Sequence, residues 1–132
     1  MTNMECVRTD EAPLPLSCYS QAVKAGDLVF VSGQVPLNPE TKKVVQGGIE
    51  AQTRQVLNNV KAIVEAAGSS IEKIVKVTVF LEDISDFKKM NDVYCTYFKK
   101  NPPARTTVQA HLLMPELLIE IDVTACSKQR RR

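Results

Sequence analysis

A single arginine follows two prolines late in the chain. Pro102 and Pro103 each fix their own φ angle and disfavour helix in the residue before them, so Arg105 comes just after a rigid corner. The β-branched residues that follow indicate a strand. A guanidinium on stiff backbone presents a fixed fork of N–H donors that matches a planar carboxylate or phosphate. Arg105 is therefore a candidate anion anchor, and the alternative is an ordinary surface arginine in an ion pair.

A glutamate on the last predicted strand is the second candidate. Strict alternation over residues 117–126 places Leu117, Ile119 and Ile121 on one face and Glu120 on the other, so Glu120 should point away from a helix-packed core. We expect Arg105 and Glu120 to project from the final strand pair. They either converge on a pocket or form a cross-strand ion pair, which contributes at most about 1 kcal/mol when exposed.

Three further residues have types that suit a ligand site. Tyr19 lies near a predicted loop and offers a hydroxyl or a ring, although partial burial with a satisfied hydroxyl is the alternative. Gly33 ends a predicted strand, where a missing side chain either lets another group approach the backbone closely or marks a β-bulge. His111 is the only histidine and is expected to be structural or exposed.

Metal and cofactor motifs are not found in the sequence. The four cysteines (Cys6, Cys18, Cys95 and Cys126) are widely spaced and form no CxxC, so no metal site is expected. No Ser-His-Asp set, phosphate loop or dinucleotide glycine pattern occurs. We expect free thiols in a reducing, cytoplasmic setting, and the sequence does not distinguish this from a mitochondrial or nuclear pool. The apolar runs are too short to span a membrane.

Charge is concentrated at the end of the chain. The 132 residues carry a net charge of +2, but four of the 17 basic residues lie in the segment 128–132. We expect residues 1–127 to form one domain and 128–132 to be a disordered basic tail. Without that tail, 13 basic residues face 15 acidic ones, which argues against a broad nucleic-acid surface. The tail is the only local feature that favours RNA.

Periodicity predicts two helices and five strands. Residues 1–20 read as irregular chain, followed by a hairpin of 20–25 and 28–35 around Gly26. Apolar residues at helical spacing predict a helix over residues 49–67, and a second helix begins at about residue 84 and ends before Asn101. The remaining strands are expected over residues 74–81, 104–110 and 117–126.

The order of these elements favours an α+β fold. Two amphipathic helices each need one side of a sheet, and a single mixed sheet with both helices on one face satisfies both. The uncovered face would then show Lys76, Phe80, Leu118 and Glu120. Apolar side chains on an open face point to burial by association with another subunit.

Several motifs, in order over residues 12–125, make the chain similar to a known family. It resembles the RidA/YjgF/UK114 family of reactive imine deaminases. The matching segments are Tyr19-Ser20-Gln21-Ala22, Val31-Ser32-Gly33-Gln34-Val35-Pro36, the predicted helix from Gln55 to Gly68, the strand from Val75 to Leu81, Asp86-Phe87, Asn91, Pro103-Ala104-Arg105 and Ile119-Glu120-Ile121.

The resemblance implies a chorismate-mutase-like fold that assembles as a homotrimer around a central barrel, with ligand sites between subunits. It implies hydrolysis of small 2-imino acids (2-iminobutanoate and 2-iminopropanoate), or their enamine tautomers, to 2-oxo acids and ammonia without a cofactor. Arg105 would bind the substrate carboxylate and Glu120 would position or deprotonate water. The implied substrate-binding residues are Tyr19, Gly33, Asn91, Arg105 and Thr107.

This sequence departs from the family pattern at three places. Ser17-Cys18 stands where Gly-Pro is common before the tyrosine, and Thr107 stands where many members have cysteine. The loop over residues 113–116 also differs, which affects the pocket rim. Two alternatives to deamination remain: an RNA-acting translation inhibitor or endoribonuclease, and a ligand-binding or chaperone-like trimer without turnover.

Overall fold

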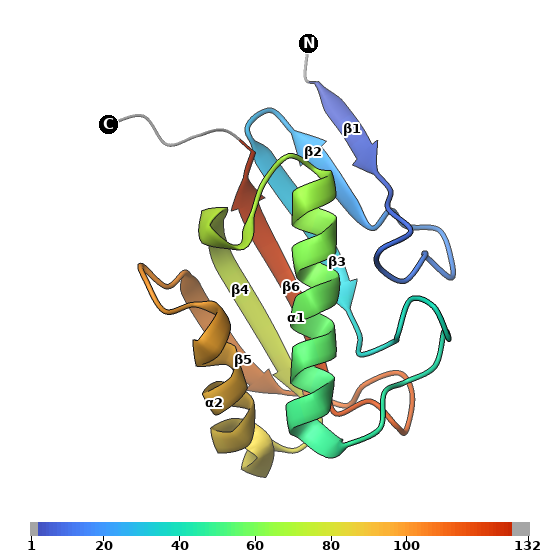
Figure 1. Cartoon of the computed structure of the whole chain (residues 1–132), viewed down its shortest axis with the longest axis vertical. Coiled ribbons are helices and arrows are strands. Elements are labelled where there is room, and N and C mark those ends of the chain that lie inside the picture. Colours follow the sequence, from blue (N-terminus) through green and yellow to red (C-terminus); the bar gives the residue numbers. More distant parts are fainter. Residues whose placement is uncertain (1–2, 128–132) are drawn as a thin grey trace.

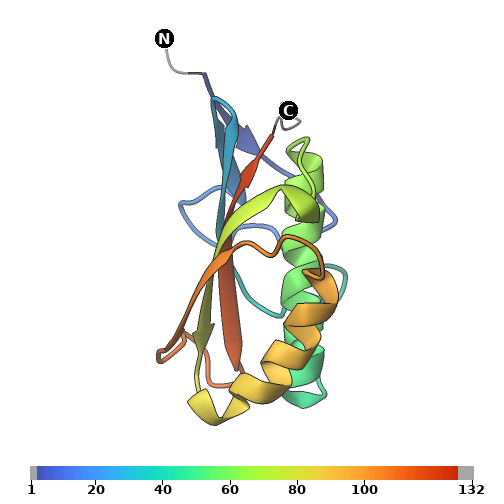
Figure 2. The same ribbon diagram turned by 90° about the vertical axis from the view of Figure 1, so that its left-hand side faces the viewer.

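The computed structural model describes residues 3–127 and consists of one mixed sheet with two helices on one face. Figures 1 and 2 show both helices against the same side of the sheet, which confirms the predicted α+β architecture. The strand order is β1-β2-β3-β6-β4-β5, and only β4 and β5 run parallel. The elements are β1 (Met4–Val7), β2 (Ala22–Ala25), β3 (Leu28–Gln34), α1 (Gly48–Ala66), a 3₁₀ turn (Ile71–Lys73), β4 (Ile74–Leu81), a second 3₁₀ turn (Ile84–Asp86), α2 (Phe87–Tyr97), β5 (Ala104–Gln109) and β6 (Ile119–Cys126).

The core lies between the sheet and the helices. On β4, Val77, Val79 and Leu81 are completely buried, and the alternate residues of β6 behave in the same way. The apolar stripe of α1 covers them. Each fully buried aliphatic side chain contributes roughly 1.5–3 kcal/mol to folding, so this layer dominates stability. The predicted bounds of β4 and the phase of β6 are therefore confirmed.

Three predictions about the sheet are wrong. Met4–Val7, expected to be irregular, forms an edge strand that pairs with β2; it has only four residues, three of them exposed, and so gives no readable alternation. Leu118, expected on the open face, precedes β6 and packs against the core. β5 and β6 are not neighbours, because β4 lies between them.

Buried amide side chains tie the long loops to the sheet and to α1. Gln21 accepts a hydrogen bond from Thr9 N (2.7 Å) and donates to the carbonyl oxygens of Thr9 (3.0 Å) and Pro13 (2.9 Å). Gln52 on α1 donates to Glu116 O (2.9 Å) and accepts from Leu118 N (2.8 Å). These bonds satisfy loop backbone groups that would otherwise be buried without a partner.

The second face of the sheet carries no helix (Figure 2). Phe30 pairs with Thr124 across β3 and β6 on this face and is 47% exposed, and Leu28 and Val108 are also exposed there. Within residues 3–127, no helix is both long enough and apolar enough to cross a bilayer.

Candidate active site

Arg105 is held against α2 by its side chain. It lies on the edge strand β5 in register with buried Val77, so it faces the helix layer. Its Nη1 donates to Asn91 Oδ1 at 2.8 Å, and its guanidinium carbon lies 4.6 Å from the centroid of the Tyr94 ring. No carboxylate among residues 3–127 lies within ion-pair distance of Arg105. The surface ion pair that we considered as the alternative is therefore not formed within the described chain.

Thr107 follows Arg105 on the same face of β5, since its register partner is buried Val79. Its Oγ1 is buried and has no hydrogen-bond partner within the described chain. A buried hydroxyl without a partner lowers folding stability by about 1–3 kcal/mol. The Thr107 hydroxyl therefore either destabilises the protomer or forms a hydrogen bond to a group outside the described chain.

Glu120 lies on the opposite, helix-free face. It is in register with Phe80, and the residues before and after it on β6 point into the core. A Cβ placed on Gly33 would overlap the Glu120 carboxylate, so Gly33 is the residue that makes room for it. The register between β3 and β6 also shifts between Val31 and Gln34. Both alternatives for Gly33 thus hold: it lies in a β-bulge, and the bulge admits a close approach.

Two carboxyl groups share this part of the open face. Burial raises the pKa of Glu120, and the neighbouring charge of Asp122 raises it further. Burial also raises the pKa of Asp122, while a hydrogen bond with Thr78 and the charge of Lys76 oppose that shift. A carboxylate with a raised pKa is a better base than an exposed one, which suits proton transfer.

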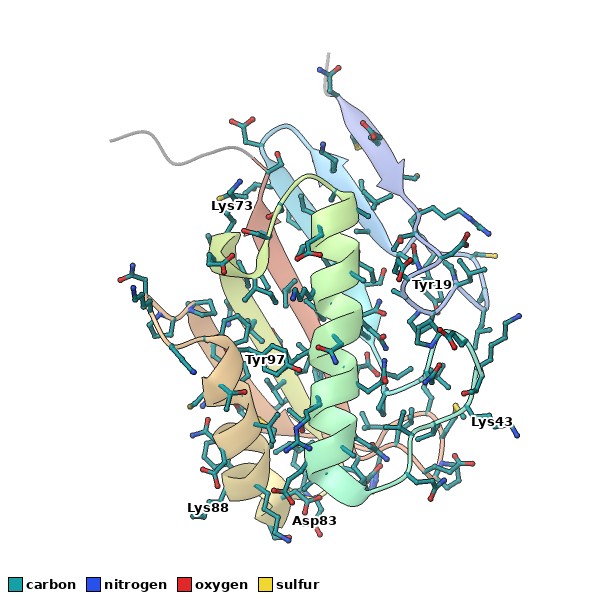
Figure 3. The ribbon with its side chains drawn as sticks, viewed as in Figure 1. Tyr19, Lys43, Lys73, Asp83, Lys88 and Tyr97 are labelled. Carbon is teal, nitrogen blue, oxygen red and sulfur yellow. The ribbon has the colours of Figure 1, made fainter. Side chains whose placement is uncertain are left out.

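Tyr19 lies on the loop that leads into β2. Its side chain is exposed, and its hydroxyl accepts only a long hydrogen bond from Leu16 N (3.4 Å). Ser32 in the bulge donates from its N to Gln21 O (2.9 Å) and from its Oγ to Ser20 O (2.6 Å), which fixes this loop beside β3. Figure 3 shows Tyr19 across the width of the sheet from α2. A cavity of about 220 Å³ lies beside it.

The candidate residues therefore form two clusters. The Arg105 cluster consists of Asn91, Arg105 and Thr107, and the Glu120 cluster consists of Gly33 and Glu120, with the loop that carries Tyr19 held beside β3 by Ser32. They lie on opposite faces, with β4 between the strands that carry Arg105 and Glu120. Within one protomer Arg105 and Glu120 do not meet, so the cross-strand ion pair, one of the two alternatives that the sequence left open, is not formed. The expectation that both residues project from one strand pair is wrong. Arg105 and Glu120 are separated by the order of the strands in the sheet, which the alternation of apolar and polar residues along a strand does not reveal.

Other polar candidates lie elsewhere. The His111 side chain is 99% exposed, and its Nδ1 lies 2.8 Å from Glu82 Oε2. A hydrogen bond from Leu112 N, followed by that from His111, lowers the pKa of Glu82, so this cluster anchors a loop. Within residues 3–127, no group of three His, Cys, Asp or Glu side chains is arranged to hold a metal ion.

Sequence reasoning missed two aromatic contacts of Arg105. Tyr94 and Phe87 lie at an apolar spacing that suits any amphipathic helix, yet their ring centroids are 4.6 and 5.6 Å, respectively, from the guanidinium carbon of Arg105. The available signal was the spacing of Phe87, Asn91 and Tyr94, which places all three on one face of a helix.

Comparisons with known proteins agree over nearly the whole chain. The family model described as "Endoribonuclease L-PSP" matches residues 9–127. A RutC family protein of Pyrococcus horikoshii is 50% identical over 121 residues, covering 92% of this chain and 96% of that protein. The chloroplastic Reactive Intermediate Deaminase A of Arabidopsis thaliana is 46% identical, covering 92% of this chain and 65% of that one.

A solved structure with a bound small molecule shares the fold. The crystal structure of E. coli TdcF with bound serine superimposes with a TM-score of 0.88 at 38% identity, covering 92% of this chain and 98% of that one. Matches of this length and identity, together with the predicted motifs, establish the family. The chain belongs to the RidA/YjgF family, whose matching family model bears the description endoribonuclease L-PSP.

Proposed function

We propose that this protein is a cofactor-free deaminase that hydrolyses 2-imino acids, such as 2-iminobutanoate and 2-iminopropanoate, to 2-oxo acids and ammonia. Enamine tautomers enter the same reaction after protonation at C3. The observation that carries the proposal is Arg105: a guanidinium fixed by Asn91 and Tyr94, with no carboxylate of the described chain paired to it. Two relatives support the assignment, one named a reactive intermediate deaminase and one crystallised with serine, an amino acid that carries a carboxylate.

Arg105 binds the substrate carboxylate in this proposal. One of its N–H donors is used by Asn91, which leaves the rest of the fork for a bidentate, charge-assisted pair. Thr107 contributes mainly through its backbone, which continues the same strand. Because the carboxylate is distant from the bonds that change, Arg105 binds the ground state and the transition state alike and chiefly sets affinity.

Glu120 handles the proton in the hydrolytic step. Water adds to the imine carbon as Glu120 takes one of its protons, which forms a tetrahedral carbinolamine. Glu120 then returns the proton to the nitrogen, and the C–N bond breaks as the carbonyl forms. The proton of the carbinolamine hydroxyl passes to Glu120 and on to the departing ammonia, which leaves as ammonium. An iminium carbon is already electrophilic, so a positioned carboxylate with a raised pKa suffices. Gly33 and Tyr19 shape the space around it.

A complete site requires a second protomer. Because the Arg105 and Glu120 clusters lie on opposite faces, we propose that they meet across an interface in a homotrimer whose open sheet faces enclose a central barrel. The exposed apolar side chains of that face, Leu28, Phe30 and Val108, are the surface that such an assembly would bury.

Trapping of the imine tests the activity. A threonine dehydratase releases 2-iminobutanoate, and semicarbazide captures it. We expect the wild-type protein to divert the imine to 2-oxobutanoate and so to lower semicarbazone formation. Arg105→Ala should lose about 100-fold in kcat/KM, mostly in KM, since it removes a bidentate charged contact. If the protein does not compete with the trap, or if Arg105→Ala competes equally well, the proposal is wrong.

Ribonuclease activity is the second candidate, because the matching family model is described as an endoribonuclease. The basic segment 128–132 that favours RNA in the sequence lies outside the described residues. Cleavage of RNA by the purified protein, lost on deletion of residues 128–132 and steeply weakened by salt, would support it. Absence of cleavage, or cleavage that disappears on further purification, would count against it.

A further inference from the structure

One face of α2 supports Arg105. Phe87, Asn91 and Tyr94 are spaced at i, i+4 and i+7, and each contacts the guanidinium of Arg105. Asn91 accepts its hydrogen bond, and the Tyr94 ring lies closer than the Phe87 ring. The Tyr94 ring centroid is within the range in which a cation and an aromatic face attract each other. The three side chains together restrict where the guanidinium can point.

Tyr94 carries a polar atom that the core does not need. The residue is only 4% exposed, and its ring packs on Phe98 with 4.5 Å between centroids. Its buried hydroxyl makes no hydrogen bond of good geometry within the described chain. Such a group costs about 1–3 kcal/mol, and a phenylalanine would fill the same space without that cost. The presence of a tyrosine rather than a phenylalanine at this position therefore suggests that the hydroxyl has a role besides packing.

The hydroxyl stays neutral and close to Arg105. Burial raises the pKa of Tyr94, and two effects of Arg105 offset part of that shift: its positive charge, and a side-chain contact with the hydroxyl that falls short of hydrogen-bond geometry. At neutral pH the oxygen is therefore an available acceptor beside a guanidinium with unused donors. In unliganded sites such contacts are often long and tighten only when the substrate binds.

We propose that Tyr94 is a positioning residue for Arg105: its ring is the surface on which the guanidinium rests, and its hydroxyl accepts an N–H when a substrate carboxylate is bound. With Asn91 and Tyr94 each taking one of the five N–H donors, the outer edge of the fork is turned toward the ligand. This inference rests on the carboxylate-anchoring role proposed for Arg105.

The test separates the ring from the hydroxyl. Tyr94→Phe removes only the hydroxyl, and Tyr94→Leu also removes the aromatic face. For each variant, KM and kcat are measured with 2-iminobutanoate, and the Kd of 2-oxobutanoate is measured by calorimetry. We expect Tyr94→Phe to raise KM and Kd by about tenfold with kcat within about twofold, and Tyr94→Leu to raise them further. The melting temperature of Tyr94→Phe should be no lower than that of the wild type. If Tyr94 had only a structural role, weaker binding would be accompanied by a lower melting temperature.

Tyr97 provides the matched control on the same helix. Its hydroxyl donates to Asn58 Oδ1 at 2.9 Å, away from Arg105, so Tyr97→Phe should leave KM and Kd unchanged. A Tyr94→Phe protein with wild-type KM and Kd overturns the inference while the deaminase proposal stands. Binding of 2-oxobutanoate without imine turnover overturns the deaminase proposal, and the Kd values then decide on Tyr94 alone. If the wild type does not bind 2-oxobutanoate, both are wrong.

Discussion

At the scale of single residues, Glu120 is the group whose protonation should control the rate. It is half-buried beside Asp122, and burial together with that neighbouring charge raises its pKa above the ordinary glutamate value of 4.5. A general base must be ionised to accept a proton from water. The ionised fraction of Glu120 falls as the pH falls through this raised pKa, so activity should decline on the acidic side at a higher pH than an exposed glutamate would give.

Asp122→Asn should move this acidic limit to lower pH. Removing the Asp122 charge removes one of the two causes that raise the pKa of Glu120, so Glu120 stays ionised further into acid. The measurement is kcat/KM for 2-iminobutanoate between pH 4 and 8. Glu65→Gln, on the exposed outer face of α1, is the control and should leave the limit in place. A limit that does not move in Asp122→Asn would show that another group controls it.

Thr107→Val should raise stability. The valine keeps the β-branched shape that β5 favours and removes a buried hydroxyl without a partner, so we expect a gain of about 1 kcal/mol in unfolding free energy. Chemical denaturation of the two proteins provides the comparison. A loss of stability would mean that the hydroxyl is satisfied in the folded protein.

The sequence predicted which residues are candidates for the site, but not which side chains surround them. Arg105 after a proline corner and Glu120 on the outward phase of a strand could both be predicted, because residue type and alternation are local properties. The support of Arg105 by Tyr94 could not, since the same spacing describes an ordinary buried stripe. Nor does a sequence reveal that the Thr107 hydroxyl lacks a hydrogen-bond partner in the described chain, because its possible partners come from segments that are distant in the sequence.

At the scale of elements, the bulge in β3 positions the Glu120 cluster. One extra residue between Val31 and Gln34 leaves Gly33 facing the Glu120 side chain, and Ser32 uses its N–H and hydroxyl to hold the loop that carries Tyr19. Bulges of this kind redirect side chains at functional sites. The predicted strands and helices matched because their periodicity is strong, whereas the short edge strand β1 has too little pattern to be recognised.

Gly33→Ala should abolish most activity with little effect on stability. The new Cβ would overlap the Glu120 carboxylate, and the flexible glutamate side chain would move away. A displacement of about 1 Å costs on the order of 100-fold in rate, so kcat should fall by that amount.

Gly26→Ala is the control for Gly33→Ala, because the alanine should affect stability and not kcat. Gly26 has a φ of 60° in the turn between β2 and β3 and open space around its Cβ position. Alanine there should lower stability by about 1 kcal/mol and leave kcat unchanged. If Gly33→Ala instead retains wild-type kcat, close packing of Glu120 against the bulge is not needed for catalysis.

At the scale of the whole molecule, the Arg105 cluster and the Glu120 cluster lie on opposite faces of the sheet. Nothing in the sequence pattern reveals that β4 separates β5 from β6, so the expected pair could not be rejected before the strand order was known. The open face, in contrast, was expected, because two amphipathic helices were predicted to cover only one side of a single sheet. The proposed association of protomers would cover the open apolar face and bring the two clusters together.

Phe30→Glu should break this association. It places a charge at the centre of the exposed apolar group on β3. By sedimentation, we expect the wild type at three times the protomer mass of 14.7 kDa and the variant as a monomer without deaminase activity. Lys61→Glu, on the exposed side of α1, should remain trimeric and active. A monomeric wild type, or a monomeric variant with full activity, would contradict the shared site.

The most direct test of a shared site mixes two impaired variants. Arg105→Ala retains Glu120, and Glu120→Gln retains Arg105. When the two proteins are unfolded and refolded together in equal amounts, half of the protomers supply each intact residue, so about a quarter of the intersubunit sites should contain both. With 2-iminobutanoate kept well below the KM of each protein, we expect deaminase activity to return to about a quarter of the wild-type value, although each variant refolded alone stays on the order of 100-fold below the wild type. A mixture as impaired as its components would contradict the shared site.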